Sequence, residues 1–296
     1  MDMTINLLGS YRNGNYDVTI FSDGTKIREN DLDFFEAQFP ENIDLKITDY
    51  CDVNCAFCHE NSTVHGEHSI LDAEFFRTLR PYTELAIGGG NPLSHPELIP
   101  FLINLKKSKI LANLTVNQVH FEKHYNLLKH LMDKELIRGL GVSLVNPTDK
   151  FISMVQSLDN LIIHTINGII SKNQISKLYD KNLKVLILGY KNIRRGKDYY
   201  SESVDQNIEM MYNLLKYGLT EHFEIVSFDN LALNQLRVKS LISKSLWDEF
   251  YMGDDGQHTM YIDLVKREFS KSSTCFERHP LMDDIDNMFA VVKTIK

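Results

Sequence analysis

The chain has 296 residues, a net charge of −8 and 43% hydrophobic residues, which suits one large globular domain or a domain with small appendages. The acidic balance argues against a broad basic face, so bulk nucleic acid is not an expected partner. No apolar run has the length of a membrane span, no signal peptide is evident, and four cysteines, three of them clustered, do not suggest a disulfide framework, so we expect a cytoplasmic protein without a membrane contact.

The first 40 residues predict a small N-terminal β-hairpin appendage, with residues 1–40 as a unit of their own. The stretch YDVTIFSDGTKIR alternates around Asp23-Gly24, which is a strong hairpin signal. Pro40 then interrupts the chain. Residues 43–48, IDLKIT, begin a new unit as its first strand.

Predicted helices and strands alternate through residues 41–235. The predicted helices cover residues 72–79, 97–107, 121–134, 149–158, 173–179 and 207–217, and a predicted strand follows each of them. This order implies a parallel sheet with right-handed crossovers. About six such units are too few for a closed eightfold barrel, and functional residues are expected at the carboxyl ends of the strands.

Residues 236–296 depart from this alternation and predict a C-terminal cap. Strand-like stretches follow Asp255-Gly256, and residues 282–293 form an amphipathic segment that predicts a helix. We expect this β-hairpin and helix to pack near the mouth of the barrel.

Three cysteines lie in one short loop after the first barrel strand. Cys51, Cys55 and Cys58 have the spacing C-x3-C-x2-C in TDYCDVNCAFCHE. Three thiolates can hold three irons of a [4Fe–4S] cluster and leave the fourth iron open, whereas ordinary electron-transfer clusters use four cysteines. A Cys3His zinc site with His59 is an alternative, but structural zinc sites usually divide their ligands into two pairs. If the three thiols were unrelated, their spacing would be a coincidence.

The loop resembles the signature of the radical S-adenosylmethionine superfamily, including the aromatic Phe57 before the third cysteine, which we count among the cofactor-binding residues. The resemblance implies that S-adenosylmethionine binds the open iron and is cleaved reductively to a 5′-deoxyadenosyl radical, which takes a hydrogen atom from a substrate. It also implies a low-potential electron donor of the flavodoxin or ferredoxin type. The predicted fold is therefore an α/β partial (βα)6 TIM-type barrel, with a small N-terminal β-hairpin and a C-terminal β-hairpin and helix cap.

A second motif, GGGNPLSHPEL at residues 88–98, resembles the G-G-E-P motif of the same superfamily. The resemblance implies that Gly89, Gly90, Asn91 and Pro92 hold the methionyl ammonium group of the cofactor through backbone groups. Glycine allows this close approach because it lacks a Cβ atom. Asn91 stands where the superfamily has an acidic residue, which weakens cofactor binding if the charge matters. A glycine-rich βα turn is the structural alternative.

Three further positions fit cofactor roles by their place at strand ends. The resemblance implies that Ser143 faces the ribose and that Ile169, in the segment INGI, packs against the adenine. Asn117 ends the third strand and could also face the pocket. The alternative for each residue is an ordinary strand-end or core role.

A basic cluster follows the sixth strand in LGYKNIRRGKDYY. Lys191, Arg194 and Arg195 would suit a carboxylate, a phosphate or a peptide backbone of a substrate. A solvated loop is the alternative. His59 supports the cluster, contacts the substrate or, as is commoner for a lone histidine, has a hydrogen-bonded structural role.

Cys275 is the remaining thiol. It is an inert, partly buried thiol, a hydrogen-atom donor to a substrate radical, a fourth ligand of the cluster in a resting state, or a remnant of an auxiliary cluster. One cysteine cannot hold an auxiliary cluster, so we predict a single [4Fe–4S] cluster.

The expected function is hydrogen abstraction from a peptide substrate, because the two terminal units could bind an extended peptide by strand addition. A nucleoside or another small metabolite is the alternative substrate. Two other classes stay open, namely a non-catalytic iron–sulfur or zinc protein, and an S-adenosylmethionine enzyme that works without radicals.

Overall fold

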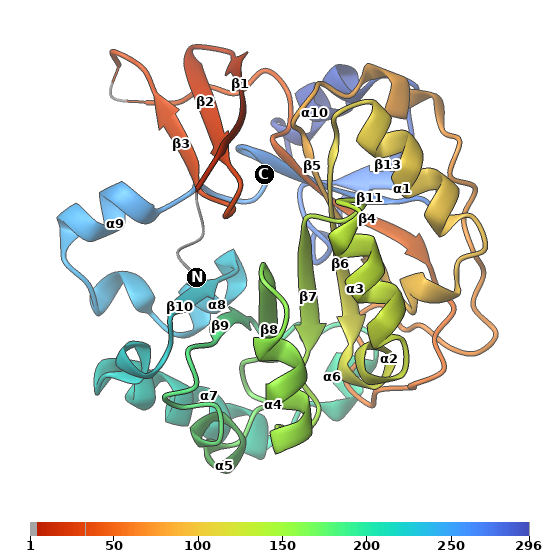
Figure 1. Cartoon of the computed structure of the whole chain (residues 1–296). Coiled ribbons are helices and arrows are strands. Elements are labelled where there is room, and N and C mark those ends of the chain that lie inside the picture. The colour runs from red at the N-terminus through yellow and green to blue at the C-terminus, as the bar shows by residue number, and fades with distance from the viewer. Residues whose placement is uncertain (1–4, 33, 296) are drawn as a thin grey trace.

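The computed structural model describes residues 5–32 and 34–295; residues 1–4, 33 and 296, which fall within the predicted terminal units, lie outside the described residues. Two sheets are present in this part of the chain (Figure 1). A ten-stranded sheet has the order β10-β9-β8-β7-β6-β5-β4-β11-β12-β13, and a three-stranded sheet has the order β1-β2-β3. The large sheet does not close on itself, which confirms the predicted α/β partial barrel.

Strands β4 to β10 pair in parallel, in chain order, as the predicted alternation requires. Their bounds are β4 (Asn42–Thr48), β5 (Glu84–Gly89), β6 (Leu111–Asn117), β7 (Gly139–Ser143), β8 (Leu161–Ile166), β9 (Lys184–Leu188) and β10 (Ile225–Phe228). Because side chains alternate across a strand, each strand presents one set to the helices and the other to the hollow side of the sheet.

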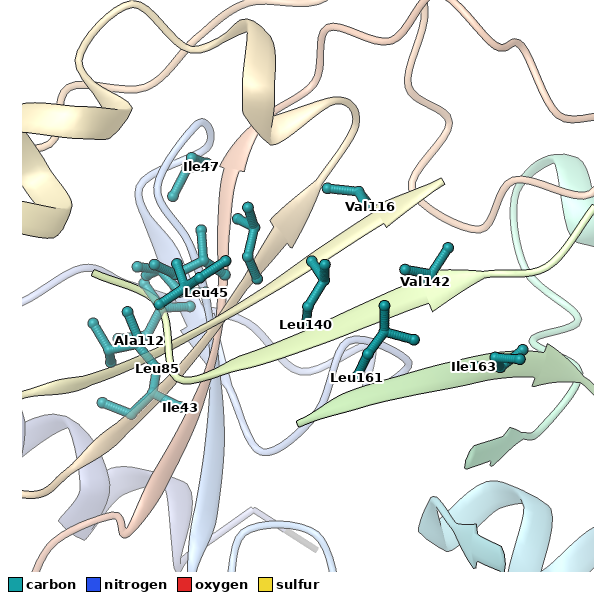
Figure 2. Close-up of a cluster of buried hydrophobic side chains, with 14 of the residues drawn as sticks. Ile43, Leu45, Ile47, Leu85, Ala112, Val116, Leu140, Val142, Leu161 and Ile163 are labelled. Carbon is teal, nitrogen blue, oxygen red and sulfur yellow. The ribbon is translucent and has the colours of Figure 1, made fainter. Parts of the chain in front are cut away.

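The helix-covered face of the sheet is apolar and forms the core. Figure 2 shows a cluster of these side chains, among them Ile43, Leu45, Ile47, Leu85, Ala112, Val116, Leu140, Val142, Leu161 and Ile163. All of them are buried. Burial of apolar area contributes about 25 cal/mol per Å², so this face stabilises the barrel. The hollow face carries small and polar residues on β5 and β7, together with aliphatic residues such as Ile162 on β8 and Leu186 on β9, and most of them are partly exposed.

The α-helices match most of the predicted ones. They are α1 (Leu98–Lys107), α2 (Gln118–Lys123), α3 (Tyr125–Asp133), α4 (Asp149–Gln156), α5 (Lys172–Ser176), α6 (Arg195–Tyr199), α7 (Glu202–Lys216), α8 (Asn230–Gln235), α9 (Lys244–Phe250) and α10 (Ile285–Val292). The predicted helix at 72–79 is a short 3-10 helix over Glu74–Thr78, and the predicted helix at 121–134 is divided into α2 and α3. Helices α6, α8 and α9 were not predicted. No helix in residues 5–32 and 34–295 is long and apolar enough to cross a bilayer.

The N-terminal unit contains one strand more than the predicted hairpin. The hairpin is β2 (Tyr16–Phe21) and β3 (Lys26–Glu29), and β1 (Leu7–Asn13) pairs with β2 on the other side. This sheet lies at the amino ends of the barrel strands, where Lys26 pairs with Glu84 at 2.8 Å. Asn160, just before β8, donates to the carbonyl oxygen of Ser22 at 3.3 Å. The sheet therefore covers the end of the barrel that is opposite to the cysteine loop (Figure 1).

The predicted C-terminal hairpin is present and continues the large sheet, a pairing that the sequence did not predict. Strand β11 (Thr259–Asp263) pairs in parallel with β4, and β12 (Glu268–Ser270) and β13 (His279–Pro280) follow in antiparallel order. Sequence reasoning missed this because the β4–β11 pairing joins residues more than two hundred positions apart and leaves no local signal. The domain boundaries near residues 40 and 235 stay predictions.

Candidate active site

The cysteine loop begins where β4 ends and folds back on itself. The backbone N–H of Cys51 donates to the carbonyl oxygen of Thr63 at 2.8 Å, and that of Cys58 donates to the carbonyl oxygen of Cys55 at 3.2 Å. All three cysteines are free and half-buried. The fold therefore gathers them in one loop at the carboxyl end of the first barrel strand, where parallel α/β sheets place their ligands.

The three thiols are close enough to influence one another. Burial raises the pKa of Cys55, and the neighbouring thiols Cys58 and Cys51 raise it further. Within the described residues, no three His, Cys, Asp or Glu side chains converge on a point that could hold one metal ion. A zinc ion needs its thiolates about 2.3 Å from one centre, whereas a cubane offers each cysteine a separate iron. Three thiols in one loop thus suit three irons of a cluster.

The glycine turn after β5 docks directly on the cysteine loop. The N–H of Gly90 donates to the carbonyl oxygen of Thr48 at 2.8 Å, and that of Asn91 donates to the carbonyl oxygen of Tyr50 at 2.6 Å. A Cβ atom on Gly89 would collide with the Thr48 oxygen, and one on Gly90 with the Tyr50 oxygen. Gly89 also has φ +113°, which favours glycine. Packing alone thus accounts for both glycines, and their cofactor role stays a prediction.

Asn91 stands where the superfamily motif has an acidic residue, and the groups around it give a physical reason for the amide. Its side chain is buried, its Oδ1 accepts from the N–H of Leu93 at 3.2 Å, and its Nδ2 donates to Asp52 at 3.4 Å. Asp52 also pairs with His120 at 2.6 Å. A carboxylate at position 91 would face the carboxylate of Asp52, so the amide avoids a like-charge contact. Pro92, also buried, starts the short 3-10 turn that follows.

The predicted cofactor residues Asn117 and Ser143 lie side by side on the hollow face of the sheet, because they are partners in the β6–β7 register. The Oδ1 of Asn117 accepts from the N–H of Val119 at 2.9 Å and thereby caps α2. Ser143 is partly exposed. Ile169 lies in the turn after β8, and the ring of Phe57 packs edge-on against Tyr199, with their centroids 5.6 Å apart. Cofactor contacts at these positions stay predictions.

His164 extends this polar row and was not predicted. It is the β8 partner of Ser143, and its ring occupies the space that a Cβ atom on Gly141 would need. Its Nδ1 is buried without a hydrogen-bond partner in the described part of the chain. Burial lowers its pKa to about 4, so the imidazole is neutral near pH 7. The signal in the sequence was a histidine at a hollow-facing position of the apolar run LIIHTIN.

Asp44, on the hollow face of β4, was not predicted either. Solvent reaches its carboxylate, yet the surrounding protein lowers its solvation and raises its pKa to about 6, an effect that the charge of Lys191 opposes. The hollow therefore contains a neutral imidazole and a carboxylate that is readily protonated.

The predicted basic cluster faces the cysteine loop. Arg195 donates to the carbonyl oxygen of Ser62 at 2.6 Å, and Arg194 donates to that of His59 at 2.8 Å. The Nζ of Lys191 lies 3.2 Å from the Nε2 of His59. These contacts fasten the loop, and substrate binding by the four residues stays a prediction.

Cys275 lies between β12 and β13, in a loop that borders a pocket of about 550 Å³ together with Arg194. Its thiol is half-buried and has one weak contact, 3.7 Å from the carbonyl oxygen of Glu277. The geometry tests none of the four predicted roles of Cys275.

No protein-family model matches the chain. It is 25% identical over 133 residues to a probable GTP 3',8-cyclase of Pyrococcus abyssi, a match that spans 43% of this chain and 42% of that protein.

The fold is similar to that of SuiB from Streptococcus suis. The structure of SuiB bound to the precursor peptide SuiA has a TM-score of 0.59 at 15% identity, covering 87% of this chain and 65% of SuiB. The structure of SuiB bound to S-adenosylmethionine has a TM-score of 0.56 at 15% identity, covering 79% of this chain and 60% of SuiB. The chain thus spans less than two thirds of the length of each of these proteins, and the similarity to SuiB is one of fold.

Proposed function

We propose that this chain, which resembles the radical S-adenosylmethionine superfamily in its cysteine loop and in its fold, is a radical enzyme that uses one [4Fe–4S] cluster and S-adenosylmethionine. The observation that carries the proposal is the set of three free thiols in one loop, docked on a glycine turn at the carboxyl ends of a partial barrel. The similarity in fold to SuiB, which has been crystallised with S-adenosylmethionine, supports it. Free thiols suit a reducing, cytoplasmic setting.

Cys51, Cys55 and Cys58 would hold the cluster. When bound, the cluster would supply the electron that cleaves S-adenosylmethionine and so starts hydrogen abstraction, with a low-potential flavodoxin or ferredoxin as the electron source. The chain's own residues would bind and orient S-adenosylmethionine. Because Gly89 and Gly90 have no side chain, their turn brings backbone groups next to the cysteine loop. The polar row on the hollow face offers hydrogen bonds to the bound molecules.

The substrate that we propose is a peptide. The fold match to SuiB in complex with a precursor peptide supports this, and so does the open seam of the barrel. In the described residues no strand lies beside the outer edge of β10, so an extended peptide could add there and reach the hollow. The N-terminal sheet, first considered for this role, lies at the opposite end of the barrel (Figure 1).

A nucleotide is the alternative substrate. Support comes from the sequence match to a probable GTP 3',8-cyclase, which spans less than half of either chain. Neutral hydrogen-bonding side chains on the hollow face, such as Asn117, Ser143 and His164, would suit a base and a sugar as well as a peptide backbone.

Anaerobic reconstitution with iron and sulfide tests the proposal. We expect about four irons per chain, a brown chromophore, and release of 5′-deoxyadenosine from S-adenosylmethionine after addition of dithionite. Release of S-adenosylhomocysteine instead would indicate a methyltransferase, and a colourless zinc protein would indicate a non-catalytic binding protein. Peptides encoded beside the gene, with GTP as the comparison, then test which substrate stimulates cleavage.

A further inference from the structure

Lys46 is a buried ammonium group directly below the cysteine loop. It lies on β4, its side chain is 2% exposed, and it contacts three carboxylates: Asp49 at 2.6 Å, Glu60 at 3.0 Å and Asp263 at 3.0 Å. A buried cation is costly unless it is paired, and here it is paired on three sides. Two of the carboxylates belong to the loop region and the third to β11, so one charge joins three segments.

Glu60 is the second centre of this network, two residues after Cys58. Its carboxylate is nearly buried and lies 3.2 Å from Arg194, which follows β9. The hydroxyl of Tyr261, on β11, donates to it at 3.4 Å. Glu60 therefore connects the end of the cysteine loop with the loop after β9 and with the C-terminal hairpin.

Arg194 completes the arrangement, because it also donates to the backbone carbonyl of His59 at 2.8 Å. The charges nearly balance. The cations Lys46 and Arg194, with Lys191 beside His59, offset the carboxylates of Asp49, Glu60 and Asp263. All of these contacts join groups of the chain itself, on β4, in the cysteine loop, after β9 and on β11.

We propose that Lys46, Glu60 and Arg194 form a latch that keeps the cysteine loop in its ligating conformation before any cluster binds. The inference rests on the proposed function, since that function makes the loop a cluster site. The three residues are positioning residues, which act through the backbone after Cys58. A loop that is already ordered loses less conformational entropy when it takes up a cluster, so assembly is faster.

Hydrogen exchange of the cluster-free protein tests the latch. The amides of Cys51, Cys58 and Asn61 are hydrogen-bonded within the loop region and report on its order. We expect their exchange to rise at least tenfold in Glu60→Gln and in Arg194→Met, while amides of β6 to β8 keep their wild-type rates. Glu60→Gln keeps the size and shape of the side chain and removes only its charge. It is preferred to Lys46→Met, which could prevent the protein from folding.

Lys197→Met is the matched control, because it removes one positive charge three residues after Arg194, from an exposed side chain for which the described residues show no ion pair. It should leave loop exchange unchanged, and Arg194→Lys should restore part of the protection. The rate of chromophore formation from iron and sulfide should fall in both latch variants, with the final iron content unchanged.

Unchanged loop exchange in both latch variants, or an equal rise in Lys197→Met, would overturn the latch. The exchange measurement needs neither cluster nor S-adenosylmethionine. Failure of the proposed function would instead appear as missing cleavage in reconstituted wild-type protein, so the two failures are distinguishable.

Discussion

The two ends of the barrel are each organised around one buried charge, of opposite sign. At the amino end, the carboxylate of Glu41 is 1% exposed and pairs with Arg28 at 2.8 Å and with Lys26 at 3.2 Å. At the carboxyl end, the ammonium of Lys46 is 2% exposed and pairs with three carboxylates. The partners differ in kind, since Lys26 and Arg28 belong to a strand and most partners of Lys46 belong to loops.

The two charge networks support different properties of the protein. Strand β3 is already fixed by its ladder with β2, so the charges at Glu41 add stability to a structure that has other supports. Within residues 52–62 the backbone donates few hydrogen bonds, so the proposed latch would supply much of the order of the cysteine loop. Changes at the amino end should therefore reduce the free energy of unfolding, and changes at the carboxyl end should reduce function.

Cys55→Ala should have the largest effect on function and little effect on stability. This change removes a half-buried thiol that we propose as a cluster ligand, so cluster assembly and cofactor cleavage should both be abolished. The free energy of unfolding of the cluster-free protein should change by no more than about 1 kcal/mol, as for a partly exposed site. Iron content, 5′-deoxyadenosine release and urea unfolding measure the three quantities. Full iron content together with full cleavage would refute the ligand assignment.

Glu41→Gln should do the opposite, reducing stability and leaving cofactor cleavage unchanged. It leaves Arg28 without its carboxylate and Lys26 with Glu84 alone, and loss of one partner of a buried ion pair costs about 3–5 kcal/mol. Urea unfolding should show this loss, while cleavage per folded molecule stays at the wild-type level. Glu209→Gln breaks the exposed pair with Arg237 and should cost less than about 1 kcal/mol. Equal losses of unfolding free energy in the two variants would show that the buried ion pairs of Glu41 contribute no more than the exposed pair.

Acid should weaken the amino end through His258. This histidine is 4% exposed and faces Tyr16, Glu41, Arg28 and Lys26. Burial and the nearby cations lower its pKa to about 4, against the attraction of Glu41. The folded pKa is thus below the unfolded value, so its contribution is complete above about pH 6.5 and is lost as the pH falls towards 4.

The loss is on the order of 2–3 kcal/mol. Urea unfolding at a series of pH values measures it, and His258→Gln should flatten the dependence in this range. If the slope is the same in the variant, other groups cause the acid sensitivity.

Cys275→Ala should have the smallest effect. The thiol makes one weak contact, so cluster content and cofactor cleavage should stay at wild-type levels. A loss of product from the substrate with cleavage retained would identify a hydrogen-atom donor. A loss of the cluster itself would indicate the fourth-ligand role.

Local patterns were sufficient for the barrel and for the cysteine loop. The strands follow from apolar alternation, and the three thiols follow from their spacing within eight residues. Strand β1 was missed because LLGSYRN does not alternate clearly, and α9 because a helix of seven residues is too short to show a helical period. His164 was missed because one polar residue in an apolar strand gives no spacing to test.

Long-range pairings were beyond prediction for a different reason. Lys46 and Asp263 are 217 positions apart, and either residue alone looks like an ordinary surface charge in the sequence. The same holds for Arg194 and Glu60, where the sequence correctly indicated a basic cluster at a strand end but not which groups it faces. Contacts of this kind become visible only when the strands have been placed in order.

The position of β11 beside β4 has a consequence for biosynthesis. A ribosome that adds 5–20 residues per second needs roughly 10–40 s to travel from Lys46 to Asp263. During that interval β4 lacks one neighbouring strand, and its lysine lacks one of three counter-charges. The proposed insertion of an iron–sulfur cluster would therefore follow translation of the C-terminal hairpin, because the cysteine loop lacks part of its support until then.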